Sequence, residues 1–564
     1  MTNTAATSGT DVAFDRADML RRLADETFDV VVIGGGITGV GVALDAASRG
    51  LRTALVERDD FASGTSSKSS KLVHGGLRYL QQGEVRLVYE ALHERRRLCR
   101  NAPHLVSVLP FMIPILTRDG VVSRKIARVL GTSMWMYDLT GGWRIGKLHK
   151  RLKRDAAFAH LPTMPIARLA SAYLYYDASA DDARLCLTVA RTAVAHGAAV
   201  ANRCRVVRVC RDSADRANGV VVDTGGNEIL VRASVVVNAA GVWADNVRTL
   251  AEGSDPDSIR PAKGVHITVP WEKVRNDIAV VIPVPKDKRS LFVVPWGPRG
   301  DGTFQHTYVG TTDTDYDGPL DDPQCTKDDI DYVLRALNAS VTTGITAEDI
   351  TGVWAGLRPL VKTAGSARTA DLSRRHRIAE DGAGIISVTG GKLTTYREMA
   401  EDTVDLVLGR IGVPGRFGRA AGCRTKRLPL RGAEGFRAPA AGAADAHLAR
   451  RYGSRLGEVR SLIDKDPALE AALVRGQPYT RAEAVYAVRH EMATTLDDVL
   501  SRRTRARLFD REATVEAAES VAALIGPELG WTAAEQRAAV DQYRASCAHE
   551  AAAGRVSTVV QEPA

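Results

Sequence analysis

The chain of 564 residues is too long for a single hydrophobic core, and its length predicts about three domains. With 45% hydrophobic and 25% charged residues, it has the composition of a globular protein, which excludes disordered and fibrous classes. Its formal net charge of +9 favours an acidic partner, which is a nucleic acid, an anionic membrane or a phosphorylated substrate.

Signals for secretion, membrane crossing and metal binding are missing from the sequence. Apolar runs are too short to cross a bilayer, and the first ten residues lack the basic and apolar regions of a signal peptide. The seven cysteines are scattered without Cys-x-x-Cys spacing, which disfavours disulfides and metal sites. We therefore expect a cytoplasmic protein without a metal.

Residues 1–27 are expected to be a flexible tail that includes a short amphipathic helix, since Met19, Leu20 and Leu23 recur at helical spacing. The apolar run FDVVVI from Phe28 then predicts a buried strand. It leads into the pattern Gly34-x-Gly36-x-x-Gly39, a helix of small residues and a second strand that ends at Glu57.

This strand, turn, helix and strand form the dinucleotide-binding pattern. Gly34 permits the tight turn, Gly36 lets the backbone approach a pyrophosphate, and Gly39 allows the helix to pack closely. Glu57 is placed to accept hydrogen bonds from the adenosine ribose. The alternative is a glycine-rich turn without a ligand, in which Glu57 is a solvated strand end, and the complete order of strand, turn, helix, strand and acid disfavours it.

The polar stretch of residues 65–80 follows, with the sequence TSSKSSKLVHGGLRYL. We expect four of its hydroxyls to contact the pyrophosphate or the flavin, namely those of Thr65, Ser66, Ser67 and Ser70. A solvated connection is the alternative for a serine-rich loop.

Residues 118–154 concentrate positive charge and large apolar side chains. Met134, Trp135, Met136, Tyr137 and Trp143 are interleaved with ten cations: Arg118, Arg124, Lys125, Arg128, Arg144, Lys147, Lys150, Arg151, Lys153 and Arg154. Such a segment suits an anionic bilayer surface. The alternative is a solvated charged face with Trp135 packed inside.

NAD would bind at the same Gly34-x-Gly36-x-x-Gly39 turn, so the choice of FAD rests on two later segments. The apolar strand from Val235 ends in small residues, so Ala240 and Gly241 are expected to pass the adenosine side of a long cofactor. The TGGKLTT turn predicts backbone amides beside the flavin ring and a helix start that stabilises the reduced flavin, and a glycine-capped turn without a ligand is the alternative. Its expected contacts are Gly390, Gly391, Lys392, Leu393 and Thr394.

These segments predict an α/β fold with discontinuous domains. A Rossmann-like FAD-binding domain of the D-amino-acid oxidase/glutathione reductase type is assigned to residues 28–109, 180–260 and 353–412. An inserted α+β domain over residues 110–179 and 261–352 is expected to bind substrate and face the membrane. Residues 413–564 are predicted to be an all-helical C-terminal domain whose charges are structural.

Seven motifs resemble the FAD-dependent, membrane-associated, aerobic glycerol-3-phosphate dehydrogenases (EC 1.1.5.3). GGGITG, TSSKSSKLVHGGLRYL, ASADDARL, KGVHITVP, VGTTDTDY, GLRPL and GGKLTTYR occur in that order over residues 28–410. The resemblance implies a substrate pocket lined by Arg78, Tyr79, Arg358, Lys392 and Thr394, with Arg374 as a looser match. Arginine forks and a lysine also suit a phosphate dianion on physical grounds.

Oxidation of an alcohol needs a base for the hydroxyl proton, and His74 and His266 are the candidates. Arg358 is expected to stabilise the developing alkoxide and so is counted as catalytic. A structural role is the alternative for either histidine. Asp313 and Asp315 are interpreted as turn residues, and Asp181 and Asp182 as helix caps.

The expected reaction is FAD-dependent oxidation of sn-glycerol 3-phosphate to dihydroxyacetone phosphate. The resemblance implies reoxidation by a membrane quinone at the inner face of the cytoplasmic membrane. An oxidase that releases hydrogen peroxide is the first alternative. An RNA-modifying flavoprotein and a redox-inert FAD scaffold are the others, although we expect no nucleic-acid partner. The oligomeric state stays open, with a homodimer among the alternatives.

Overall fold

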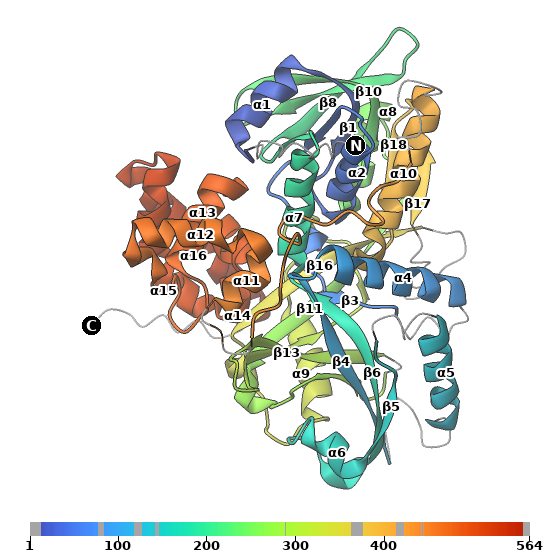
Figure 1. Ribbon diagram of the computed structural model, residues 1–564, viewed down its shortest axis with the longest axis vertical. Helices are drawn as coiled ribbons and strands as arrows, with labels where there is room; N and C mark the ends of the chain where they lie inside the picture. The colour runs from blue at the N-terminus through green and yellow to red at the C-terminus, as the bar shows by residue number, and fades with distance from the viewer. Residues whose placement is uncertain are drawn as a thin grey trace, which may run out of the picture.

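The computed structural model describes residues 13–76, 84–117, 127–140, 146–287, 289–362, 376–412, 422–440, 443 and 445–555. Figure 1 shows two sheet-based layers stacked along the long axis and a group of helices beside them. The first sheet is drawn at the top, the second at the bottom, and the C-terminal helices at the left.

The first sheet has the strand order β17-β18-β10-β1-β2-β7, with β8 and β9 attached beside β10. Its centre is parallel, because β1 pairs with β10 and β2, β2 pairs with β7, and β10 pairs with β18 in parallel. The strands are β1 (Thr27–Ile33), β2 (Thr53–Val56), β7 (Ala199–Ala201), β8 (Arg205–Arg211), β9 (Ala217–Asp223), β10 (Glu228–Asn238), β17 (Arg377–Glu380) and β18 (Ile386–Thr389).

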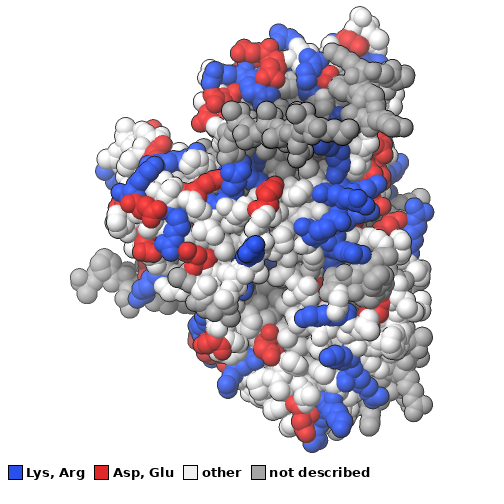
Figure 2. Space-filling view, viewed as in Figure 1, with Lys and Arg blue, Asp and Glu red and all other residues white. Residues whose placement is uncertain are grey.

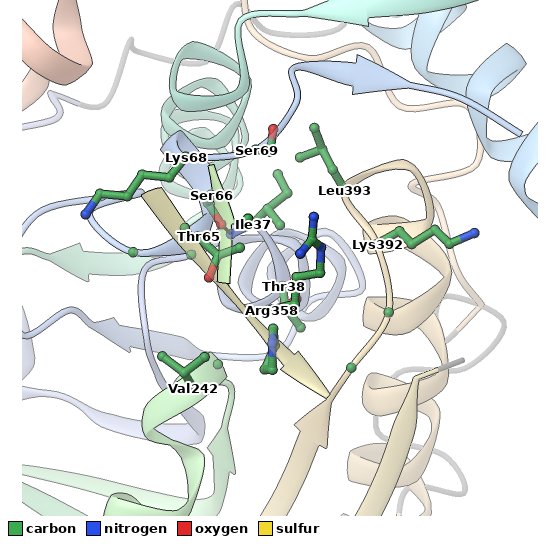
Figure 3. Close-up of a pocket in the computed structure, with 18 of the residues that line it drawn as sticks. Ile37, Thr38, Thr65, Ser66, Lys68, Ser69, Val242, Arg358, Lys392 and Leu393 are labelled. Atoms are coloured by element: carbon green, nitrogen blue, oxygen red, sulfur yellow. Dashed lines mark hydrogen bonds between the residues drawn. The ribbon is translucent and has the colours of Figure 1, made fainter. Parts of the chain in front are cut away.

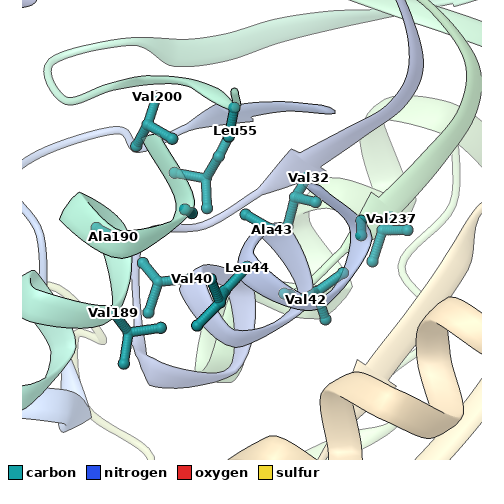
Figure 4. Packing of buried hydrophobic residues seen from close by; sticks show 14 of the residues in the cluster. Val32, Val40, Val42, Ala43, Leu44, Leu55, Val189, Ala190, Val200 and Val237 are labelled. Carbon is teal, nitrogen blue, oxygen red and sulfur yellow. The ribbon is translucent and has the colours of Figure 1, made fainter. Parts of the chain in front are cut away.

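Three helices pack together against this sheet: α2 (Ile37–Ser48), α7 (Asp182–Ala195) and α10 (Tyr396–Ile411). Every residue of α2 except Thr38 is buried, since the helix lies between the sheet and both neighbours. Figure 4 shows Val40 and Leu44 of α2 among Val189 and Ala190 of α7. Gly41 permits this contact on the other side, where a Cβ atom would lie 2.7 Å from the ring of Tyr396.

Helix α1 (Arg16–Asp25) corrects the expectation of a flexible tail through residue 27. Its Met19 and Leu23 are buried in the core of the first sheet, so the predicted apolar stripe fixes the helix in place. Residues 1–12 lie outside the described residues.

The second sheet has the order β15-β11-β14-β13-β12-β4-β6-β3, and β16 and β5 pair with β11 and β6. Helix α9 (Lys327–Asn338) contributes to the core on one face. Helices α4 (Val85–Asn101) and α5 (Ala127–Thr140) contribute to the other. The strands are β3 (Leu72–Val73), β4 (Val106–Leu116), β5 (Lys150–Lys153), β6 (Leu169–Ala180), β11 (Ile259–Pro270), β12 (Ala279–Pro283), β13 (Ser290–Pro298), β14 (Phe304–Gly310), β15 (Thr314–Asp315) and β16 (Gly352–Val361).

The GLRPL motif lies in the second sheet and not in the FAD-binding part to which residues 353–412 were assigned. It belongs to β16, which pairs antiparallel with β11 from Ile259↔Val361 to Thr268↔Gly352. The FAD-binding part resumes at β17. The sequence did not show this assignment because a buried apolar strand has the same pattern in either sheet. Only the strand with which it pairs shows the sheet to which it belongs.

The C-terminal region is helical and has its own apolar core. Its helices are α11 (Ala446–Tyr452), α12 (Leu456–Lys465), α13 (Arg481–Glu491), α14 (Ala506–Phe509), α15 (Arg511–Leu529) and α16 (Ala533–Gly554). Buried ion pairs join it to the first layer: both Nη atoms of Arg503 donate to Asp60, at 2.6 and 2.7 Å. The expected structural use of its charges agrees with these contacts. Within the described residues, no helix is long and apolar enough to cross a membrane.

Candidate active site

A continuous cavity of about 960 Å³ lies between the two sheets. Its walls include the segments that directly follow β1, β2, β10 and β18, where the parallel strands of the first sheet end. The opposite wall comes from the second sheet, through residues of β4, β6, β11, β13 and β16. Ligands of open α/β sheets bind at this carboxyl edge.

Two glycines of the turn after β1 pack closely against backbone atoms. A Cβ atom on Gly34 would lie 2.7 Å from the carbonyl oxygen of Ala239, and one on Gly39 would lie 1.9 Å from that of Gly34. Both glycines are therefore required by packing. Gly36 is the N-cap residue of α2 and lines the cavity, and Ser66 Oγ accepts the Ile37 amide at 2.8 Å. These residues fit a pyrophosphate at a helix start.

Glu57 stands at the cavity wall directly after β2. Its carboxylate accepts the amide of Gly35 at 2.5 Å and that of Asp59 at 2.8 Å. Burial raises the pKa of Glu57 to about 7, although the two amides act in the opposite direction. A ribose hydroxyl donating to this carboxylate would favour its ionised form, so the group fits the adenosine end of FAD.

The turn after β18 forms another part of the cavity wall. Gly390 and Gly391 have φ angles of 75° and 76°, which favour glycine. Lys392, Leu393 and Thr394 follow and also line the cavity, just before α10 begins. Figure 3 shows Lys392 and Leu393 on this turn, with the Lys392 amine directed away from Ile37 and Thr38. Amides at a helix start suit the oxygens of a flavin ring.

Arg358 reaches the cavity from β16, and 21% of its side chain is exposed. Its guanidinium donates to Asp313 Oδ1 at 3.2 Å, to Thr311 Oγ1 at 3.0 Å and to the Thr312 carbonyl at 3.1 Å. Gly264 on β11 makes space for it, because a Cβ atom there would lie 2.6 Å from Arg358 Nη2. Asp313, interpreted from sequence as a turn residue, thus also orients this arginine.

His266 lies on β11 and lines the cavity, although only 2% of the residue is exposed. Its ring stacks on Trp354 at a centroid distance of 4.7 Å, and its Nε2 is 2.9 Å from Ser70 Oγ. Within the described part of the chain, its Nδ1 has no hydrogen-bond partner. Burial, then the positive charges of Lys71 and Arg358, hold the pKa of His266 well below its usual value, so the imidazole is neutral.

His74 lines the same cavity and is half-buried. Its backbone is fixed by Thr394, whose Oγ1 accepts the His74 amide at 3.1 Å and donates to its carbonyl at 3.3 Å. Its ring lies 6.3 Å from that of Phe292. The structure therefore brings both candidate histidines, Arg358 and the turn after β18 to one cavity.

Two family models match the chain. One, described as FAD dependent oxidoreductase, covers residues 29–397. The other, described as the C-terminal domain of alpha-glycerophosphate oxidase, covers residues 423–536. Glycerol-3-phosphate dehydrogenase 2 of Mycobacterium tuberculosis is 42% identical over 94% of this chain and 90% of its own length.

The chain belongs to the FAD-dependent glycerol-3-phosphate dehydrogenase family. A mitochondrial glycerol-3-phosphate dehydrogenase of Mus musculus is 36% identical over 90% of this chain and 71% of its own length. The structure of the Bacillus halodurans glycerol-3-phosphate dehydrogenase complexed with FAD has a TM-score of 0.75 and 30% identity. It covers 98% of this chain and 100% of that one. The predicted family, fold class and FAD cofactor are confirmed.

Some predicted site residues of this family member are not placed at the cavity. Arg78, Tyr79 and Arg374 lie outside the described residues. Ser67 is described but does not line the cavity: it is buried, and its carbonyl accepts Lys71 Nζ at 3.4 Å. Its neighbours Thr65, Ser66 and Ser70 do line the cavity.

Sequence reasoning missed a group of aromatic and apolar wall residues from the second sheet, together with Asp177 and Trp243. The wall residues are Phe111, Ile113, Tyr175, Val281 and Phe292. Alternating apolar strands predict a sheet without indicating which face meets a ligand, so only the assembled fold identifies them. Thr38 and Ser69 also line the cavity and lie inside motifs that were recognised.

Proposed function

We propose that this protein oxidises sn-glycerol 3-phosphate to dihydroxyacetone phosphate with FAD as the hydride acceptor. The proposal rests mainly on one continuous cavity. It extends from the glycine cradle, which is the turn of Gly34 and Gly36 after β1, to the guanidinium of Arg358. The family relatives named glycerol-3-phosphate dehydrogenase, at up to 42% identity over most of the chain, support the choice of substrate.

In this proposal the cofactor spans the carboxyl edge of the first sheet. The turn of Gly34 and Gly36 would hold the pyrophosphate, Glu57 the ribose, and Ala240 and Gly241 the adenosine side. The flavin would lie at the turn of Gly390–Thr394, near Ser70. FAD, when bound, supplies a two-electron acceptor for the hydride that leaves the carbinol carbon.

Arg358 would bind the substrate and stabilise negative charge on its oxygens. Asp313, Thr311 and Thr312 hold the guanidinium, so little side-chain freedom remains to be lost on binding. In our proposal Thr394 and the turn at Lys392 complete the described part of this pocket, although the Lys392 amine is directed away from Thr38 in the structure. We expect Arg78, Tyr79 and Arg374 to add to it.

The hydroxyl proton would pass to one of two histidines. His266 is held neutral, and a neutral imidazole has one accepting nitrogen. The contact between Nε2 and Ser70 Oγ helps to hold the ring in the cavity wall. His74 is the alternative base, because it lines the same cavity beside Thr394.

Anaerobic titration of the purified yellow protein tests the substrate. We expect glycerol 3-phosphate to bleach the flavin absorbance, whereas lactate and glycine leave it unchanged. Bleaching by the controls alone would refute the assignment. RNA binding that weakens with salt, without bleaching by glycerol 3-phosphate, would instead favour the RNA-modifying alternative, and no bleaching by any of them would favour the inert scaffold.

We propose a lipid-soluble quinone as the electron acceptor, which is the dehydrogenase alternative to an oxidase. Steady-state turnover with a soluble quinone should exceed peroxide release in air. Stoichiometric hydrogen peroxide with no quinone reduction would establish the oxidase instead.

We further propose that α5 and the neighbouring β5 and α6 (Arg154–Ala159) face the inner, anionic surface of the cytoplasmic membrane. Trp135, Met136 and Leu139 are 55%, 41% and 74% exposed, which is not the packed arrangement considered for Trp135. Figure 2 shows cations gathered nearby, around β5 and α6. Such a combination suits lipid headgroups and acyl chains. The structure describes the side chains of five of the ten predicted cations: Lys147, Lys150, Arg151, Lys153 and Arg154.

Flotation with phosphatidylglycerol vesicles tests this surface. The wild-type protein should float, phosphatidylcholine should retain less of it, and Leu139→Ser should weaken binding. Leu406→Ser, at an exposed leucine of α10 that is 40% exposed, is the matched control. Equal flotation of both variants would contradict the assignment.

Sedimentation in the absence of vesicles decides between monomer and homodimer.

A further inference from the structure

A buried polar cluster meets the backbone of the active-site turn formed by His74, Gly75 and Gly76. Its three members come from different elements: Arg95 from α4, Tyr137 from α5 and Asp177 from β6. Their exposures are 0%, 1% and 2%. Asp177 also lines the cavity, although the proposed reaction gives it no role.

The cluster is ordered around the Asp177 carboxylate. Arg95 forms an ion pair with Asp177 Oδ1 and donates to the Tyr176 carbonyl at 2.8 Å. Tyr137 donates its hydroxyl proton to the same carboxylate at 2.7 Å. Burial and the nearby Asp177 raise the pKa of Tyr137 well above its usual value, so this hydroxyl remains a donor.

The Gly75 amide is bound by both acceptors of this cluster. It lies 3.2 Å from Asp177 Oδ1 and 3.3 Å from the Tyr137 hydroxyl. The packing at Gly75 is tight, because a Cβ atom there would lie 2.5 Å from Leu92 and 2.6 Å from the Tyr137 hydroxyl. A buried amide needs such partners, and removing them leaves it unsatisfied.

The His74–Gly76 turn is also held at its other end, by the turn after β18. Thr394 of that turn binds both the amide and the carbonyl of His74. The position of His74 is thus set between Thr394 and the buried cluster. We propose that Asp177, ordered by Arg95 and Tyr137, is a positioning residue that aligns the His74–Gly76 turn with substrate. This inference rests on the proposed function, because the alignment matters only for a substrate in this cavity.

Tyr137→Phe is the principal test, because it removes one hydroxyl and keeps the ring that packs in the core. Anaerobic stopped-flow reduction over a range of glycerol 3-phosphate concentrations separates the limiting rate from the apparent affinity. We expect the limiting rate per bound FAD to fall about tenfold, since a hydrogen bond to a charged group is lost. FAD content and the oxidised absorbance spectrum should equal those of the wild type.

Tyr173→Phe is the matched control. Tyr173 is also buried under α5, but its hydroxyl lies against Gly131, where a Cβ atom would be 2.9 Å away. It should reduce at the wild-type rate. Asp177→Asn, which keeps the side-chain size and removes the charge, should act like Tyr137→Phe and replaces it if that variant does not fold.

Three results would overturn the inference. One is a wild-type limiting rate and affinity in Tyr137→Phe or Asp177→Asn. Another is a lower melting temperature or FAD content with an unchanged rate per bound FAD, which would mark a purely structural cluster. The third is an equal loss in Tyr173→Phe. Failure of the wild-type protein to be reduced by glycerol 3-phosphate would instead refute the proposed function, so the two failures are distinguishable.

Discussion

Gly264→Ala is predicted to damage substrate alignment without touching the cofactor. The new methyl carbon would lie 2.6 Å from both Arg358 Nη2 and Thr311 Oγ1, and 2.9 Å from Arg358 Nη1. Non-bonded heavy atoms prefer about 3.5 Å, so the guanidinium must move by about 1 Å. A displacement of that size at a positioning group costs about 100-fold in rate.

The assay is anaerobic reduction by glycerol 3-phosphate, followed at the flavin absorbance in a stopped-flow instrument. The limiting rate should fall by about two orders of magnitude. FAD content should not change, because the glycine cradle belongs to the other sheet. Gly409→Ala on α10 is the control, since its Cβ atom would meet nothing within 4 Å. Gly264→Ala protein with a normal rate and normal substrate affinity would refute the assigned position and role of Arg358.

Three further predictions concern substrate, cofactor and stability. Arg358→Ala should abolish reduction by glycerol 3-phosphate while the protein stays yellow; a normal reduction rate would show the pocket to be wrongly assigned. The pKa of Glu57 is raised from 4.5 to about 7 in the folded apoprotein, so the folded state binds the proton more tightly than the unfolded state does. The resulting stabilisation is complete below pH 4.5 and is lost as the pH rises through 7. Glu57→Gln should remove this loss in thermal unfolding scans of the apoprotein, and an unchanged pH dependence would contradict it. Arg503→Met removes the bidentate partner of buried Asp60 but leaves Arg502 paired with it, so we expect a cost of about 2–3 kcal/mol in denaturant unfolding. Arg475→Met, in an exposed pair, should cost under about 1 kcal/mol, and equal effects would count against the buried pair.

Much of the first layer follows from local sequence. The strand, glycine turn, helix and acidic residue of the first unit lie within 31 consecutive residues, from Thr27 to Glu57, and their order dictates the local geometry. The turns at Gly241 and Gly390 were likewise indicated by small residues after apolar strands. Asp181 was expected as a helix cap, and its side chain accepts the Arg184 amide at the start of α7.

The second layer was harder to predict, for a physical reason. Residues such as Phe111 and Tyr175 contact the cavity only because β4 and β6 pair in one particular register, in which these two residues are neighbours. Nothing in either strand alone encodes that register. Asp177 was hidden for a similar reason: its partners lie 82 and 40 positions away in sequence, on α4 and α5.

The chain crosses repeatedly between the two sheets that form the walls of the cavity. β1 and β2 precede β4 and β6, β10 precedes β11, and β16 precedes β18. Neither half can be excised as a contiguous module or exchanged by a simple recombination event. Individual substitutions within β11, β16 and their neighbours can nevertheless alter the substrate side of the cavity while the turns after β1 and β18 keep their sequence.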